Sequence, residues 1–253
     1  TYGISANIAT LKNEVIKLHP NLPNLTGPVT KTEAGYPLNS YFGYVMEGIY
    51  QNSSEIATHL HGVSSPSQVP GDIRFKDLNG DGVINDNDRT HIGNPNPRLV
   101  YGANFRLGYK GLDLSFLFQG VAGVERYNDL KKIIDYDSRP FNHTIATLGA
   151  WNGEGSTNSM PRSTFQDNGS SQVSSIFVED ASYLRLKNIE LGYDLGRVVK
   201  PGTVFQNCRL YVSAQNLFTV TKYTGLDPES TALIDQGTYP QSRNVMLGIN
   251  VRF

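Results

Sequence analysis

The sequence is poor in cysteine, in long apolar runs and in charge. Its single cysteine, Cys208, excludes an internal disulfide and a Cys-x-x-Cys metal site. Its longest apolar runs, such as residues 116–118, are far shorter than the roughly 20 residues of a spanning helix, which excludes transmembrane helices. Charged residues make up 18% of the chain, below the roughly 25% of an ordinary soluble domain. The mean hydropathy is nevertheless −0.34, so the chain is polar overall, and its polarity comes from Asn, Ser, Thr, Gln and Gly rather than from charged residues.

The charge balance and the motifs exclude two further classes of function. The net charge is −1, from 22 basic and 23 acidic residues, and without a basic cluster we expect no nucleic-acid partner. A nucleophile motif such as G-x-S-x-G is absent, so we do not expect an enzyme. The chain begins at Thr1 without a signal-like segment, and we interpret it as a fragment or a processed chain.

Aromatic residues are plentiful, with 14 Tyr and 11 Phe, and many lie in stretches where apolar and polar residues alternate. Such alternation is the signature of a β-strand with one apolar face. The same pattern predicts strands over residues 99–109, 112–118, 183–195 and 207–217, and a weaker one over 2–8. The clearest strand is the last, whose apolar residues are Val245, Leu247, Ile249, Val251 and Phe253.

Two local features refine this prediction. Lys110 and Gly111 form a tight turn between two of the strands, which predicts a hairpin. In the 183–195 strand, Leu184 and Leu186 are out of phase with Ile189, which predicts a β-bulge. The strands exceed the usual length of roughly 5–6 residues. Long strands with one apolar and one polar face fit a transmembrane β-barrel, although a soluble antiparallel sheet has the same alternation.

The connections between the strands favour the barrel. Residues 10–98, 120–182 and 218–242 form long connections without predicted regular structure, and they alternate with short turns at 110–111 and 196–206. Outer-membrane barrels have long extracellular loops and short periplasmic turns, whereas soluble sandwiches rarely hold such long loops. If the strand ending at Phe253 finishes at the periplasmic rim, all three long connections are extracellular. Aromatic residues in the first one are expected mostly to pack within it, namely Tyr36, Tyr41, Phe42, Tyr44 and Tyr50.

Residues 77–88 follow the EF-hand loop pattern D-x-[DN]-x-[DN]-G, with an acid at the twelfth position. The pattern predicts a structural Ca²⁺ site because hard cations prefer oxygen ligands. Asp at the last position replaces the usual Glu, so a modest affinity is expected, and turn-forming chemistry alone also explains the pattern. The expected ligands are Asp77, Asn79, Asp81, the Val83 carbonyl and Asp88.

Several short motifs recur through most of the chain in one order. They are GDIRFKDLNGDG (71–82), DR (88–89), IGNPNP (92–97), YG (101–102), KGLDL (110–114), FQG (118–120), YLRLKN (183–188), SAQNLF (213–218) and YPQSR (239–243). In sequence and order these motifs resemble the C-terminal barrel portion of the SusC/RagA family of TonB-linked outer-membrane transporters from Bacteroidetes-type bacteria.

The resemblance implies an all-β fold, a transmembrane antiparallel barrel of about 22 strands with a plugged lumen. Residues 1–253 would then supply its last six strands, with the plug and the earlier strands absent. The resemblance further implies a Gram-negative outer membrane, lipid around the barrel, a SusD-like lipoprotein over its mouth, and TonB acting through the missing N-terminal region. It implies active import of glycans or peptides, and leaves the substrate-binding residues unknown.

Two alternatives remain at this point. A soluble β-sandwich that binds or adheres through a dockerin-like calcium loop would have the same alternation. A secreted hydrolase would need a convergent pair of acids, for which only loop carboxylates are available: Asp135, Asp137, Glu154 and Asp167.

Overall fold

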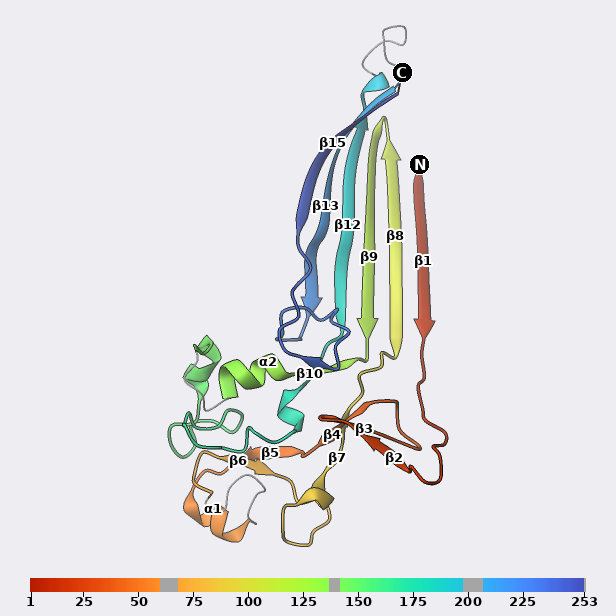
Figure 1. Cartoon of the computed structure of the whole chain (residues 1–253). Helices are drawn as coiled ribbons and strands as arrows, with labels where there is room; N and C mark the ends of the chain where they lie inside the picture. Colours follow the sequence, from red (N-terminus) through yellow and green to blue (C-terminus); the bar gives the residue numbers. More distant parts are fainter. Residues whose placement is uncertain (60–67, 137–141, 198–206, 253) are drawn as a thin grey trace.

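The computed structural model describes residues 1–59, 68–136, 142–197 and 207–252. Its largest element is a six-stranded antiparallel sheet with the strand order β1-β8-β9-β12-β13-β15 (Figure 1). The strands are β1 (Tyr2–Thr10), β8 (Leu99–Tyr109), β9 (Leu112–Ala122), β12 (Tyr183–Asp194), β13 (Asn207–Thr221) and β15 (Asn244–Arg252). All six predicted strands are therefore confirmed. Strands β9 and β13 run past the expected boundaries at 120 and 218.

The hairpin and the bulge are also confirmed. Lys110 and Gly111 both have positive φ, 47° and 91°, as a two-residue turn between twisted strands requires. The pairing of β12 shifts register between Leu186 and Asn188 against both β9 and β13. Against β9, Lys187 is the extra residue, and the shift restores the phase of the apolar residues that follow. Against β13, the extra residue lies in β13, between Gln215 and Phe218, where Asn216 has a positive φ of 52°. The expected turn at 196–206 lies largely outside the described residues.

The sheet has one apolar and one polar face, as the alternation predicts. Cross-strand pairing aligns one apolar row over all six strands: Tyr2, Leu107, Leu114, Leu191, Val212 and Leu247. A row on the other face is polar in five strands, with Leu117 of β9 as the exception: Ser5, Asn104, Leu117, Asn188, Gln215 and Asn244. Val245 and Leu247 are 72% and 83% exposed, so among the described residues no second sheet covers the apolar face at these positions, as a soluble sandwich would require. Phe253 lies outside the described residues.

The three long connections gather at one end of the sheet, and the Lys110–Gly111 turn lies at the other (Figure 1). They contain regular structure, which corrects the expectation that they lack it. One small sheet has the order β2 (Asn24–Thr26), β3 (Thr30–Glu33), β4 (Ser40–Gly43) and β7 (Thr90–Gly93). The other two comprise β5 (Met46–Ile49) with β6 (Ile73–Phe75), and β11 (Val178–Asp180), β10 (Glu125–Asn128) and β14 (Ile234–Asp235).

Helical segments in these connections are short. Helix α1 spans Ser53–Thr58, and α2 spans Asp129–Lys131 and continues as a π-helical turn, Lys132–Tyr136. Single 3₁₀ turns in these connections occur at Asp86–Asp88, Ile145–Gly149 and Ser175–Phe177, and a further one, Leu195–Arg197, follows β12 outside them. None of the helices in the described ranges has the length and apolar character needed to span a bilayer.

All three connections share one hydrophobic core, and together we call them the loop layer. Its main cluster joins Tyr41 of the first connection to Tyr127 and Phe177 of the second, with Ile234 of the third packed against it. The Tyr41 hydroxyl also donates a hydrogen bond to the Leu233 carbonyl at 2.8 Å. Of the aromatics expected to pack within the first connection, Tyr41, Tyr44 and Tyr50 are at most 2% exposed and Tyr36 is exposed. Tyr41 corrects the expectation in part, because it packs against the second connection rather than only within the first.

Candidate functional site

Four charged side chains join the third connection to the polar face of the sheet, and we call them the ion cluster. The Arg185 guanidinium contacts Asp227 Oδ1 through Nη2 and Glu229 Oε2 through Nη1, both at 2.6 Å. Lys187 Nζ lies 2.7 Å from Glu229 Oε2. Arg185 and Asp227 are buried, and the two positive and two negative charges balance. The ion cluster therefore fixes residues 227–229 against strand β12.

The environment of Asp227 keeps it ionised. Burial by itself raises the pKa of this carboxyl group. The backbone N–H groups of Gln241 and Glu229 and the Arg185 guanidinium outweigh burial and hold the pKa below its ordinary value of 3.8. The two N–H donors lie 2.9 Å from the Asp227 oxygens. Asp227 thus orders the backbone of its own connection as well as tying it to the sheet.

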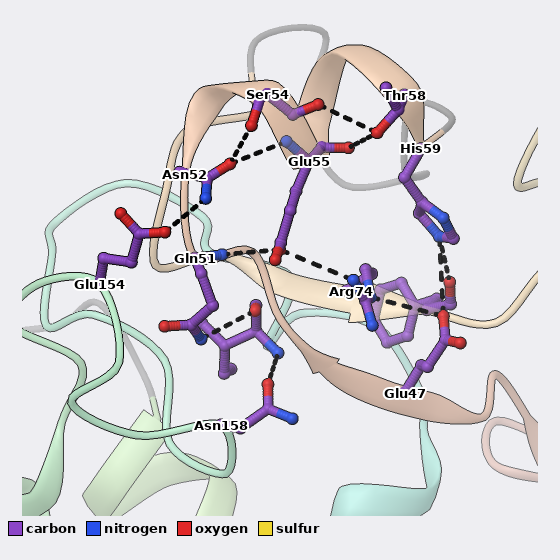
Figure 2. A network of polar contacts seen from close by, with 12 residues as sticks. Glu47, Gln51, Asn52, Ser54, Glu55, Thr58, His59, Arg74, Glu154 and Asn158 are labelled. Atoms are coloured by element: carbon purple, nitrogen blue, oxygen red, sulfur yellow. Dashed lines mark hydrogen bonds and ion pairs between the residues drawn. The ribbon is translucent and has the colours of Figure 1, made fainter.

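A cavity of about 430 Å³ opens in the loop layer between the first and second connections. Glu55, Arg74, Glu154 and Asn158 are among the residues that line it, and we call it the Glu55 pocket (Figure 2). Glu55 projects from α1 and Arg74 from β6, whereas Glu154 and Asn158 lie on the second connection.

Two side chains hold the walls of the Glu55 pocket together. Gln51 donates to the carbonyls of Ile49 and Thr157, both at 3.0 Å, and its oxygen accepts from Trp151 Nε1 at 3.1 Å. Asn52 caps α1 by accepting from Glu55 N–H, and its amide donates to Glu154 Oε1 at 2.6 Å (Figure 2). An amide side chain satisfies an N-terminal N–H of the helix in this way. The contacts of Gln51 with Thr157 and Trp151, and that of Asn52 with Glu154, therefore join the first connection to the second.

Acidic groups outnumber basic ones around this pocket. Arg74 lies between two carboxylates, with Nε 3.4 Å from Glu47 Oε2 and Nη1 3.6 Å from Glu55 Oε2. Glu154 adds a third carboxylate. His59 Nε2 lies 3.2 Å from the Phe75 carbonyl and 3.8 Å from Glu47 Oε2. The pocket therefore has more acceptors than its one guanidinium can satisfy.

The predicted calcium ligands lie in a compact loop between β6 and β7. Asp77 accepts hydrogen bonds from the N–H groups of Gly80 at 2.7 Å and Gly82 at 3.1 Å. Asn79 Oδ1 accepts from Asp81 N–H at 2.9 Å. Gly80 and Gly82 have positive φ, 71° and 87°, which is the conformation that a sharp turn needs. These contacts give the loop a closed shape.

Asp88 closes the other end of this loop and is fully buried. Its Oδ1 accepts from Leu78 N–H at 2.9 Å and its Oδ2 from Asn85 N–H at 2.8 Å. Burial acts to raise its pKa, but these backbone donors hold the pKa below the ordinary value. The Val83 carbonyl accepts from Asn85 Nδ2 at 3.0 Å. Over the described ranges, no three His, Cys, Asp or Glu side chains are grouped as a metal site would group them.

Among the described residues, the three acids considered for a hydrolase each have their own surroundings. Asp135 accepts from the Thr144 hydroxyl and Asp167 from the Ser171 hydroxyl, at 2.6 and 2.7 Å, whereas Glu154 lies at the Glu55 pocket. Asp137 lies outside the described residues. The sequence did not reveal the ion cluster or the Glu55 pocket, because both combine residues from separate connections.

Relatives of this chain bear the names of receptors and importers. It is 32% identical, over its full length, to TonB-dependent receptor P3 of Formosa agariphila, and covers 27% of that receptor. It is 27% identical to TonB-dependent receptor SusC of Bacteroides thetaiotaomicron, with 100% of the chain and 24% of SusC covered. No protein-family model matches. None of these relatives is named as an enzyme, in line with the prediction.

Solved structures agree with these relatives. The RagAB peptide transporter matches 99% of the chain with a TM-score of 0.79 and 26% identity, and the chain covers 26% of the matched protein. The open-open state of the RagAB peptide importer matches 100% of the chain with a TM-score of 0.78, at 26% identity and 26% coverage of that protein. The chain thus spans about a quarter of the length of its relatives. The predicted resemblance and the all-β barrel-fragment fold are confirmed.

Proposed function

We propose that this chain, a SusC/RagA-like part of a TonB-dependent transporter, forms part of the barrel wall and the outer loops of an active outer-membrane importer. The observation that carries the proposal is the exposed apolar face of the six-stranded sheet, whose rows continue across all six strands. Lipid is the partner that such a face fits, because outer-membrane barrels alternate apolar-out and polar-in. The remaining strands and the plug would come from elsewhere in the protein.

In this proposal, residues 10–98, 120–182 and 218–242 are extracellular loops of a Gram-negative, Bacteroidetes-type cell. Their position at one end of the sheet supports this topology (Figure 1). Protease treatment of whole cells tests it, because cleavage should occur in these connections and spare the Lys110–Gly111 turn. Cleavage confined to that turn would overturn the topology.

The partners follow from the same proposal. A SusD-like lipoprotein would sit over the loop layer, and TonB would act through the N-terminal region of the whole protein. The imported substrate would be a glycan or a peptide. Uptake of a candidate substrate by cells with and without TonB tests this role, together with co-purification of a lipoprotein from the outer membrane. Uptake that is independent of TonB would contradict it.

We also propose that the 77–88 loop binds Ca²⁺ and is stiffened by it. The closed loop and the oxygen-rich donor set of Asp77, Asn79, Asp81 and the Val83 carbonyl support the proposal. Asp88 already satisfies backbone donors, so a weak site is expected. Chelator treatment should speed proteolysis near Asp81, and Ca²⁺ should reverse the effect. An unchanged rate would count against binding.

A further inference from the structure

A second cavity, of about 470 Å³, adjoins the Glu55 pocket, and the two share Asn158 in their linings. The second cavity, which we call the Met160 pocket, is lined by four large apolar side chains, Met46, Tyr136, Met160 and Ile176, and by two charged ones, Glu47 and Lys131. Gly48 lines the Met160 pocket, and a Cβ atom there would overlap the Asn158 side chain. A glycine at this position therefore lets Asn158 lie against β5, where both pockets reach it.

The polar groups with spare hydrogen-bonding capacity define what the joined pockets could hold. Asn158 Oδ1 accepts from Ile49 N–H at 2.7 Å, which leaves its amide N–H₂ without an acceptor among the described residues (Figure 2). Glu55 uses Oε2 for the Gln51 N–H and for Arg74, and Glu154 uses Oε1 for Asn52. The other oxygen of each carboxylate has no partner in the described part of the chain. The free groups are thus two acceptors and, next to them, one amide donor.

We propose that the joined pockets bind the amino terminus of an apolar peptide. The ammonium group would lie at Glu55 and Glu154, the first carbonyl would accept from the Asn158 amide, and an apolar side chain would occupy the Met160 pocket. A carboxylate end fits less well, because both cations of the joined pockets are already paired: Arg74 with Glu47 and Glu55, and Lys131 with Glu179 at 2.8 Å. The inference rests on the proposed importer function. It makes the joined pockets, which we call the groove, an outer capture site for the substrate of the importer.

Binding of labelled peptides to the purified full-length transporter tests the inference. The probe is a Leu-Leu-Gly-Ser-Gly peptide with a fluorophore at its carboxyl end, followed by anisotropy. Acetylation of its amino terminus should weaken binding about tenfold, the equivalent of one charge-assisted hydrogen bond. An acetylated peptide that carries an internal lysine shows whether any ammonium suffices. Equal binding of the free and acetylated peptides would overturn the inference, as would full rescue by lysine.

Substitutions assign the effect to this groove. Glu154→Gln and Glu55→Gln should each remove most of the sensitivity to acetylation. Glu14→Gln is the matched control, because Glu14 lies in the same layer, is paired with Lys12 at 2.8 Å and lines neither of these two pockets. Glu154 is exposed, so its variant is informative even if Glu55→Gln impairs folding. Unchanged acetylation sensitivity in Glu154→Gln would refute the site.

Failure of the groove and failure of the importer role give different results. Retained TonB-dependent uptake with no acetylation effect would refute the groove alone. TonB-independent uptake would refute the importer role, while the binding comparison would still report on the groove.

Discussion

Removal of Arg185 is the sharpest test of how the third connection is held. Arg185→Met keeps much of the side-chain volume but removes the guanidinium that contacts Asp227 and Glu229. Asp227 would then be a buried carboxylate without its cation. Breaking a buried ion pair from one side costs about 3–5 kcal/mol. Glu229 retains Lys187 and is 24% exposed in its side chain, so most of this cost falls on Asp227.

The cost should appear as local release of the third connection, because the sheet keeps its backbone pairing. Hydrogen exchange and limited proteolysis of residues 222–243 in membrane-embedded protein measure this release. Exchange at the Glu229 and Gln241 amides, which donate to Asp227, should accelerate by about two to four orders of magnitude, the rate equivalent of that energy. Arg106→Met is the matched control, since Arg106 is a strand arginine that has no ion pair among the described residues.

A double substitution separates the charge effect from a packing effect. Arg185→Met with Asp227→Leu removes both buried charges, and replacing a buried pair by apolar residues is often close to neutral. Protection should therefore return in part. If Arg185→Met exchanges like wild type or like Arg106→Met, the ion cluster does not hold the connection and the reasoning fails.

Four further outcomes are expected. Acidification below about pH 4 should release the third connection. The pKa of Asp227 is lowered in the folded protein, so the stability that its ionised carboxylate contributes is lost as the pH falls. Hydrogen exchange of residues 222–243 measured against pH checks this. Ile189 lies in mid-strand on the apolar face, so Ile189→Arg should cost about 2–4 kcal/mol and impair membrane insertion. Ser115→Arg on the polar face should not, and heat-modifiability on gels reports insertion of both variants. Gly120→Ala should cost about 1–3 kcal/mol, because its Cβ would overlap the Tyr101 ring, whereas Gly3→Ala meets nothing within 4 Å; urea unfolding compares them. Asp88→Ala should cost about 1–3 kcal/mol and speed proteolysis of the 77–88 loop even without Ca²⁺, since buried N–H groups lose their acceptor.

Alternation and turn chemistry were sufficient to predict the main sheet. In β8 and β9 the period of two runs through whole strands, and the Lys110–Gly111 turn fixes their register, so pairing partners follow directly. The phase change after Leu186 located the bulge for the same reason. The short strands of the loop layer escaped prediction because elements such as β2 and β6 contain only three residues, too few to show a period.

By itself, the sequence determined the class of protein: which stretches are strands, which side of each is apolar, and which family they resemble. These properties are local, because a strand's faces depend on residues next to one another in the chain. Only the tertiary structure decided the sites. The Arg185 guanidinium meets carboxylates 42 and 44 positions away, and Asn52 meets Glu154 across 102 positions. Such pairs produce no periodic pattern in the sequence, because packing between separate segments of the chain brings them together.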